Sequence, residues 1–190
     1  MISPDLLLEA YRQGVFPMAE EGGDISWYSP DPRGVLPLEA FHLPHGLKRT
    51  LRKGTFEVRF NTAFSEVLDG CSNRKETWID SRIKDCYLTM FNLGYAHSVE
   101  AWIDGKLGGG LYGIALGGAF FGESMFHTVT DASKVALVAL VDRLRERNFG
   151  LLDLQWVTPH LATFGACEIS RRAYLRMLRE HIRRPCTFAL

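Results

Sequence analysis

Residues 97–126 carry the pattern that most constrains how this chain can fold. Three strand-like segments occur there in close succession, over 97–103, 107–116 and 119–126. The dipeptides Asp104-Gly105 and Gly117-Gly118 separate them, and both are typical of tight turns between antiparallel strands. The sequence therefore predicts a three-stranded antiparallel meander in the middle of the chain.

Helical signals flank this predicted meander. Ser3 and Pro4 are suited to open a helix over residues 4–13, with Gly14 after its end. Three further helices are predicted, each from a cap residue followed by apolar side chains at helical spacing. They are Asn61 before Phe64, Val67 and Leu68; Asp80 or Ser81 before Ile83, Tyr87, Met90 and Phe91; and Asp131 before Val135, Val138, Leu140, Val141 and Leu144.

The C-terminal part adds a predicted strand over 151–157, a helical turn near 159–164 and a helix over 171–181. The order of these elements is α+β, and it resembles the acyltransferase fold of the GCN5-related N-acetyltransferases (GNAT). Residues 14–37 are rich in glycine, proline and aromatic residues, which exclude a long helix there. We therefore expect a small N-terminal subdomain over residues 1–45 and a GNAT-like catalytic domain over 46–190.

Composition limits the class of protein. Hydrophobic residues make up 46% of the chain and charged residues 23%, as in an ordinary globular domain. No apolar run is long enough for a membrane span, and no secretory signal is recognisable at the start. The four cysteines form no CxxC pair, and His97, His127 and His160 are too scattered to indicate a metal site. We expect a cytoplasmic protein with no metal and no membrane partner.

The formal net charge is zero, but the charges are unevenly distributed. Residues 1–45 hold 7 acidic and 2 basic side chains, and basic residues gather later in the chain. One cluster consists of Lys48, Arg49, Arg52 and Lys53, and another of Arg171, Arg172, Arg176, Arg179, Arg183 and Arg184. Such clusters suit a phosphate-rich partner, although ordinary solvated helix faces can look the same.

Three polar residues stand on predicted strands. Asp153 and Gln155 are two residues apart and are therefore expected on one strand face, where a buried polar pair needs partners. The alternative is an exposed strand face. In the run FFGESMF, the strand period predicts that Phe121, Glu123 and Met125 share a face. Glu123 would then be a carboxylate among apolar groups, which indicates that something binds it.

Eight segments, taken together, resemble the leucyl/phenylalanyl-tRNA–protein transferase family. They follow one another along most of the chain, so the resemblance is more specific than any single motif. They are GVFPM (14–18), WYSPDPRGVLPL (27–38), TWI (77–79), GYAHSVEAW (94–102), LGGGLYGIALGGAFFGESMF (107–126), ASKVAL (132–137), LDLQ (152–155) and HLATFGACEISR (160–171).

The resemblance implies an enzyme without a diffusible cofactor that uses aminoacyl-tRNA as donor. It implies transfer of Leu, Phe or less readily Met to the α-amine of proteins that begin with Arg or Lys. The product would carry an N-terminal residue that marks it for proteolysis. The implied fold is a GNAT-like C-terminal domain with a small N-terminal domain.

The resemblance also implies roles for individual residues. Gln155 would orient the acceptor amine, Asp153 would fix Gln155, and Glu123 would complete the site. Trp27 and Trp78 match tryptophans of the family's site, and either could stack on the terminal adenine of the donor. Phe120, Met125 and Leu152 are candidates for the wall around the donor side chain, with plain core packing as the alternative for each. From its charge and its place beside the subdomain boundary, and not from the resemblance, we expect the cluster Lys48, Arg49, Arg52 and Lys53 to contact the tRNA; the C-terminal arginines are the alternative.

Two other classes of function are open at this point. A coenzyme-A-dependent GNAT enzyme would share the fold, but the helix that follows the meander opens with an acidic residue instead of the expected glycine-rich turn. A non-catalytic RNA-binding protein would suit the basic clusters. It gives no reason for Glu123, Asp153 and Gln155 on strand faces.

Overall fold

A seven-stranded sheet organises the structure, a computed structural model that describes residues 2–20, 22–73 and 77–189. Its strands are Arg33–Val35 (β3), Glu57–Phe60 (β4), Ala96–Ile103 (β5), Lys106–Leu116 (β6), Ala119–His127 (β7), Leu151–Gln155 (β8) and Cys167–Ile169 (β9). They lie in the order β4-β5-β6-β7-β8-β3-β9. Neighbouring strands are antiparallel except for β7 and β8, which run parallel.

The predicted meander is confirmed as β5, β6 and β7. Ala96 of β5 is opposite Ile114 of β6, and Leu116 of β6 is opposite Ala119 of β7. Gly105 and Gly117 both have positive φ angles at the turns, a conformation that glycine adopts without steric cost. The two turn signals therefore set the register of the central strands, as tight turns do in hairpins.

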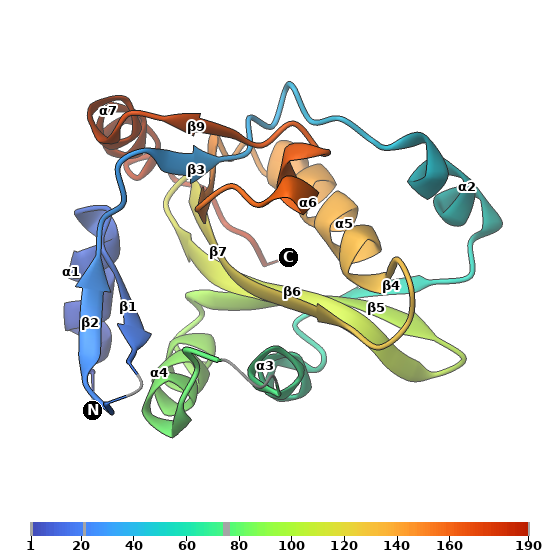
Figure 1. Cartoon of the computed structure of the whole chain (residues 1–190), viewed down its shortest axis with the longest axis horizontal. Helices are drawn as coiled ribbons and strands as arrows, with labels where there is room; N and C mark the ends of the chain where they lie inside the picture. Colours follow the sequence, from blue (N-terminus) through green and yellow to red (C-terminus); the bar gives the residue numbers. More distant parts are fainter. Residues whose placement is uncertain (1, 21, 74–76, 190) are drawn as a thin grey trace.

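Seven helices lie within the described ranges, and they cover both faces of the sheet (Figure 1). Helices α3 and α4 pack on one face, and α5 packs on the other. No helix in this part of the chain is both long and apolar enough to cross a membrane. The helices are Pro4–Arg12 (α1), His45–Lys53 (α2), Phe64–Ser72 (α3), Ser81–Asn92 (α4), Ala132–Glu146 (α5), Pro159–Ala162 (α6) and Arg171–His181 (α7).

Three of the four predicted caps stand at a helix N-cap position, and two of these form a capping bond. The Ser3 side chain accepts a bond from the backbone of Leu6, and Asp80 caps α4 in the same way. Asn61 lies before the start of α3, and its side chain instead accepts from the backbone N–H of Ser98. Asp131 precedes α5 but makes no capping bond, because its carboxylate contacts Thr50 and Lys134.

One strand of the N-terminal range belongs to the large sheet. Strands Phe16–Ala19 (β1) and Ile25–Tyr28 (β2) form a separate two-stranded sheet. Strand β3, which also belongs to the expected N-terminal range 1–45, instead lies between β8 and β9 in the large sheet. The division into residues 1–45 and 46–190 stays a prediction, but the two ranges share this sheet.

Strands β7 and β8 separate in the middle of the sheet. Their parallel pairing runs from Ala119 and Leu151 only as far as Phe121 and Asp153. Beyond that point β7 continues to His127, whereas β8 ends at Gln155 with a positive φ of 65°. The predicted strand over 151–157 is therefore too long. The divergence of the two strands leaves a space for a site between them.

Candidate functional site

A β-bulge directs Glu123 toward the helices. Ser124 of β7 is opposite Tyr112 of β6 and Gly122 is opposite Gly113, so Glu123 is an extra residue without a strand partner. A bulge breaks the two-residue alternation of side chains, and bulges often re-aim a side chain beside an active site. The expectation that Phe121, Glu123 and Met125 share one face is therefore wrong. Phe121 packs in the core layer beside α3 and α4, and Met125 packs in the opposite layer.

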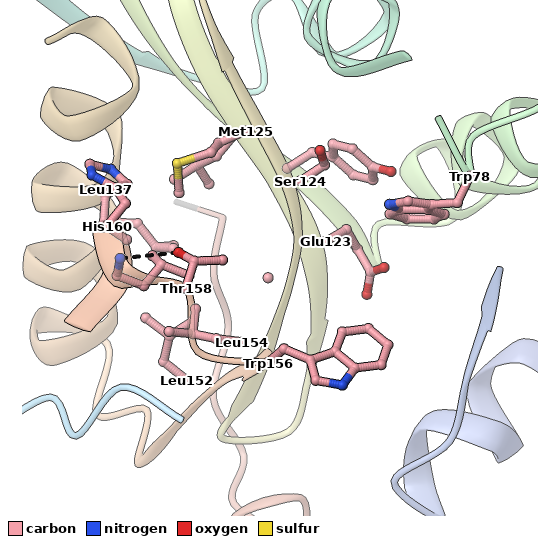
Figure 2. A pocket seen from close by; sticks show the side chains of 15 residues that line it. Trp78, Glu123, Ser124, Met125, Leu137, Leu152, Leu154, Trp156, Thr158 and His160 are labelled. Atoms are coloured by element: carbon pink, nitrogen blue, oxygen red, sulfur yellow. Dashed lines mark hydrogen bonds between the residues drawn. The ribbon is translucent and has the colours of Figure 1, made fainter. Parts of the chain in front are cut away.

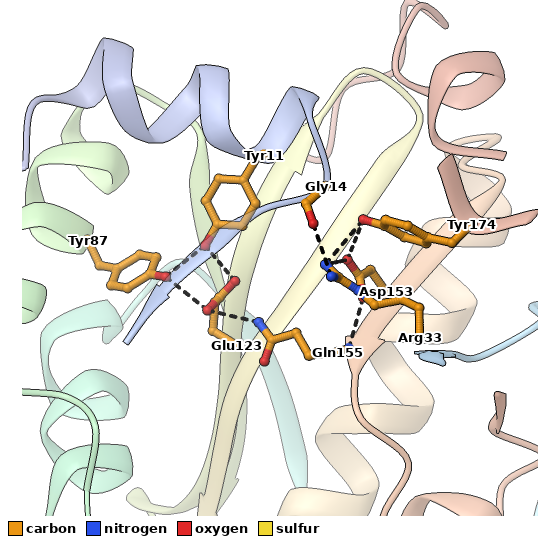
Figure 3. Close-up of polar contacts among 8 residues, drawn as sticks. All are labelled: Tyr11, Gly14, Arg33, Tyr87, Glu123, Asp153, Gln155 and Tyr174. Carbon is orange, nitrogen blue, oxygen red and sulfur yellow. Dashed lines mark hydrogen bonds and ion pairs between the residues drawn. The ribbon is translucent and has the colours of Figure 1, made fainter. Parts of the chain in front are cut away.

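The Glu123 carboxylate lies among three hydrogen-bond donors (Figure 3). The Tyr11 hydroxyl is 2.6 Å from Oε1, and the Tyr87 hydroxyl is 2.9 Å from Oε2. The side-chain nitrogen of Gln155 donates to Oε2 at 3.3 Å. Burial raises the pKa of Glu123 to about 7, and the three hydrogen bonds lower it in part. A carboxyl group that titrates near neutral pH is typical of a functional site.

Asp153 forms a buried ion pair with Arg33. The guanidinium Nε and Nη2 atoms donate to the two carboxylate oxygens at 2.9 and 2.7 Å. The Tyr174 hydroxyl adds a bond of 2.7 Å, and Arg33 also donates to the carbonyl oxygen of Gly14. Asp153 and Arg33 are 0% and 1% exposed. Asp153 therefore supplies no free negative charge to a ligand.

Gln155 is held between these two carboxylates. Its backbone N–H donates to Asp153 Oδ1 at 2.8 Å, while its side chain reaches Glu123. Its φ of 65° turns the chain away from the sheet, over Gly34 of β3. A Cβ on Gly34 would lie 2.6 Å from the carbonyl carbon of Trp156, so only glycine fits beneath this turn. Asp153 and Gln155 are thus linked through the backbone, and their side chains reach different partners.

A pocket of about 300 Å³ occupies the space between the diverging strands. In Figure 2, Glu123 and the rings of Trp78 and Trp156 lie together at one side of it, and aliphatic side chains form the other. Most of the lining is apolar, which is typical of small-molecule sites that carry a few placed polar groups. The lining side chains include Leu111, Met125, Leu137, Leu140, Leu152, Leu154, Thr158, His160 and Leu161.

The structure brings together some of the predicted site residues. Glu123, Trp78, Met125 and Leu152 line the pocket, and Gln155 contacts Glu123 at its edge. Phe120 is fully buried and packs against Phe188, away from the pocket lining. Trp27 is 39% exposed on β2 and does not line this pocket.

Several residues of the site are absent from the sequence-based prediction. Tyr11 and Tyr87 follow the apolar spacing of their helices, so the pattern marks them only as core. Arg33 carries no periodic signal, and nothing local indicates that an arginine there is buried. Trp156 follows Gln155 directly and is 42% exposed at the pocket. The only sequence signal for Trp156 is that it follows Gln155, a predicted site residue.

The predicted basic cluster lies on α2, beside a second hollow. This hollow measures about 680 Å³ and adjoins the pocket, because His160 lines both. Arg49 and Lys53 line it together with Lys134. Lys48 and Arg52 line a smaller hollow beside the same helix. None of the four forms an ion pair with a described residue, so their charges are available to a ligand.

Comparison with known proteins identifies the family. A family model described as leucyl/phenylalanyl-tRNA protein transferase matches residues 35–179, and a model of the N-terminal domain of the same family matches residues 1–31. The chain belongs to this family. It is therefore a transferase that acts between aminoacyl-tRNA and protein, as predicted. The assignment favours this activity over the coenzyme-A-dependent and non-catalytic alternatives.

Relatives in the family cover nearly the whole chain. The leucyl/phenylalanyl-tRNA–protein transferase of Herpetosiphon aurantiacus is 54% identical over 98% of both chains. The one from Akkermansia muciniphila is 54% identical over 94% of this chain and 95% of its own. A solved structure of a protein of unknown function from Staphylococcus epidermidis aligns with a TM-score of 0.49 and 12% identity, over 90% of this chain and 65% of that one. The helices and mixed sheet confirm the α+β class, and the GNAT-like fold stays a prediction.

The described residues contain no group of three or more His, Cys, Asp or Glu side chains that could hold a metal ion. Glu123, Gln155 and the aromatic residues around them are the groups within reach of the pocket.

Proposed function

We propose that this transferase moves Leu, Phe or less readily Met from aminoacyl-tRNA to the α-amine of proteins that begin with Arg or Lys. The modified proteins would carry an N-degron and enter proteolysis in the cytoplasm. One observation carries the proposal: an apolar pocket ends at Glu123, a bulge residue without a strand partner, whose carboxyl group is bound by the Gln155 side chain. Such a pocket suits an apolar donor side chain, with the ester placed at the polar end.

The proposed reaction needs little help from a strong base. The α-amine of a polypeptide has a pKa of about 7.7–8.0, so roughly a tenth of it is neutral near pH 7. Gln155 is an amide and cannot act as a strong base. Because its nitrogen donates to Glu123, its carbonyl oxygen is left to accept a bond from the amine. Placement of the amine against the ester then supplies most of the acceleration.

The remaining parts of the ligands have matching surfaces. Trp78 beside Glu123 offers a ring face on which the terminal adenine can stack, and Trp27 offers a second one farther out. Another hollow is lined by Trp156 together with the carboxylates of Asp31 and Glu168. These carboxylates, rather than the neutralised Asp153, are suited to attract the cationic side chain of the acceptor.

A transfer assay tests this proposal directly. The purified protein is supplied with pre-charged Phe-tRNA or Leu-tRNA and with peptides that differ only in their first residue. We expect transfer to peptides that begin with Arg or Lys. A peptide that begins with Glu, or an acetylated Arg peptide that lacks the α-amine, serves as control. Equal transfer to Glu and Arg peptides would contradict the proposed acceptor class.

Neutralising the α2 cluster should weaken tRNA binding. Phosphate contacts make the logarithm of affinity fall linearly with the logarithm of salt concentration, and fewer contacts give a flatter line. Replacing Lys48, Arg49, Arg52 and Lys53 by Gln should reduce the slope by up to about 4 if each contacts a phosphate. The measurement is tRNA binding across a salt series.

The arginines of the C-terminal cluster provide the matched comparison. Most of them lie on α7, which Figure 1 shows on the opposite side of the molecule from α2. Replacing Arg172, Arg176, Arg179 and Arg183 removes the same charge, and we expect a smaller change in slope. A larger change there than in the α2 variant would reverse the assignment.

A further inference from the structure

Glu123, Tyr11 and Tyr87 form a closed ring of short oxygen–oxygen contacts (Figure 3). The two tyrosine hydroxyls are 2.7 Å apart, and each also contacts one oxygen of the carboxyl group. Three hydrogen bonds need three protons, and the two phenols supply only two. A carboxylate would leave one pair of lone-pair oxygens facing each other at hydrogen-bond distance. A carboxylic acid supplies the third proton and satisfies every contact.

The surroundings of the ring favour the neutral acid. Tyr11 and Tyr87 are almost completely buried, and Glu123 is 8% exposed. The groups that face the ring are Tyr112 of β6, Gln155 of β8 and Asp153 of β8. The charge of Asp153 is balanced by Arg33. Burial raises the pKa of both tyrosines well above its usual value, so the phenols keep their protons.

Only one member of the ring reaches the pocket. Glu123 lines it, whereas Tyr11 and Tyr87 stand behind Glu123 on α1 and α4. A proton held in the ring can therefore reach a ligand only through the Glu123 carboxyl group. The polar end of the pocket is also where the proposed function places the ester.

We propose that Glu123, protonated within its buried ring with the two tyrosines, is the acid that protonates the departing ribose oxygen. This inference rests on the proposed function. The neutral acceptor amine attacks the ester carbonyl carbon and a C–N bond forms. As the ester C–O bond breaks, its electron pair stays on the ribose oxygen, which takes the proton of Glu123. The amide nitrogen then releases its extra proton to the Glu123 carboxylate, and the acid is restored.

The test compares two donors that differ in their need for an acid. An adenosine ester of Phe leaves as a strongly basic alkoxide, whereas a p-nitrophenyl ester of Phe leaves as a stable anion. The readout is the ratio of kcat/KM between Glu123→Gln and the native protein for each donor, above the uncatalysed rate. We expect a loss of about 100-fold or more with the adenosine ester and of less than about threefold with the nitrophenyl ester.

A control and a second variant complete the experiment. Glu57→Gln makes the same chemical change at a surface carboxylate paired with Arg59, and we expect both ratios to stay near one. Tyr11→Phe removes a bond that favours the carboxylate form, so the alkaline fall of kcat should move to higher pH. An unchanged pH profile in Tyr11→Phe would overturn the role of the ring.

The outcomes separate this inference from the function on which it rests. If the native protein transfers Phe and Glu123→Gln loses the same factor with both donors, Glu123 is not the acid, and the proposed function stands. If the native protein transfers from neither donor to an Arg peptide, the proposed function fails, and the acid role fails with it.

Discussion

Replacing Asp153 by Asn is expected to lower the free energy of unfolding by about 3–5 kcal/mol, because the change leaves the buried Arg33 guanidinium without its counter-charge. Arg33 is enclosed by Asp153, by the carbonyl oxygen of Gly14 and by the rings of Phe16 and Tyr174. None of the other groups carries a negative charge. Chemical denaturation monitored by circular dichroism would measure the loss.

A double variant tests whether the uncompensated charge is the cause. Replacing Arg33 by Met and Asp153 by Leu together removes both charges and keeps the site apolar. Buried ion pairs replaced in this way often lose little stability. We expect the double variant to be more stable than Asp153→Asn alone. If Asp153→Asn unfolds like the native protein and loses only transfer, the carboxylate acts on the substrate instead.

Replacing Gln155 by Ala is expected to slow transfer about 5- to 150-fold, the equivalent of roughly 1–3 kcal/mol for one positioning hydrogen bond. The side chain is the group placed to orient the acceptor amine, and it also contacts Glu123. The variant keeps the backbone N–H that binds Asp153, so the chain path is retained. Single-turnover transfer from Phe-tRNA to an Arg peptide measures the effect.

The control for this variant is Gln13→Ala. Gln13 is exposed at the end of α1 and bonds Glu9 on the surface, so its loss should leave transfer unchanged. Affinity for tRNA should stay within about twofold in both variants, because neither side chain is placed to meet a phosphate. A large drop in tRNA affinity with normal turnover at saturation would contradict the role given to Gln155.

The elements that local patterns define could be predicted from sequence. The meander follows from strand alternation and two glycine turns, and α1, α4 and α7 follow from caps and apolar spacing. Each of these signals lies within a few residues of the structure it specifies. The errors occur where distant residues decide the local conformation. Asn61 and Asp131 resemble helix caps, but partners from β5 and α2 take their side chains.

Several residues of the candidate site could be predicted from the sequence, but the hydrogen bonds and the ion pair that connect them could not. Family resemblance brings Glu123, Gln155, Trp78, Met125 and Leu152 to attention, and the structure places them at one pocket or its edge. The bulge at Glu123 has no sequence period, so the face of β7 was predicted incorrectly. The positive φ at Gln155 has no sequence signal either, so β8 was predicted to be two residues too long. Arg33, which pairs with Asp153, and Tyr11 and Tyr87, which bind Glu123, come from elements far from these carboxylates in the sequence.

The ion pair between Arg33 and Asp153 joins residues 120 positions apart, and the contact between Tyr11 and Glu123 spans 112. During synthesis the N-terminal helix and β3 leave the ribosome long before the residues that complete their contacts. Tyr174, which closes the pair, comes later still. The contacts of Glu123 and Asp153 therefore form only when almost the whole chain is available. A growing chain cannot complete this site before Tyr174 has been added.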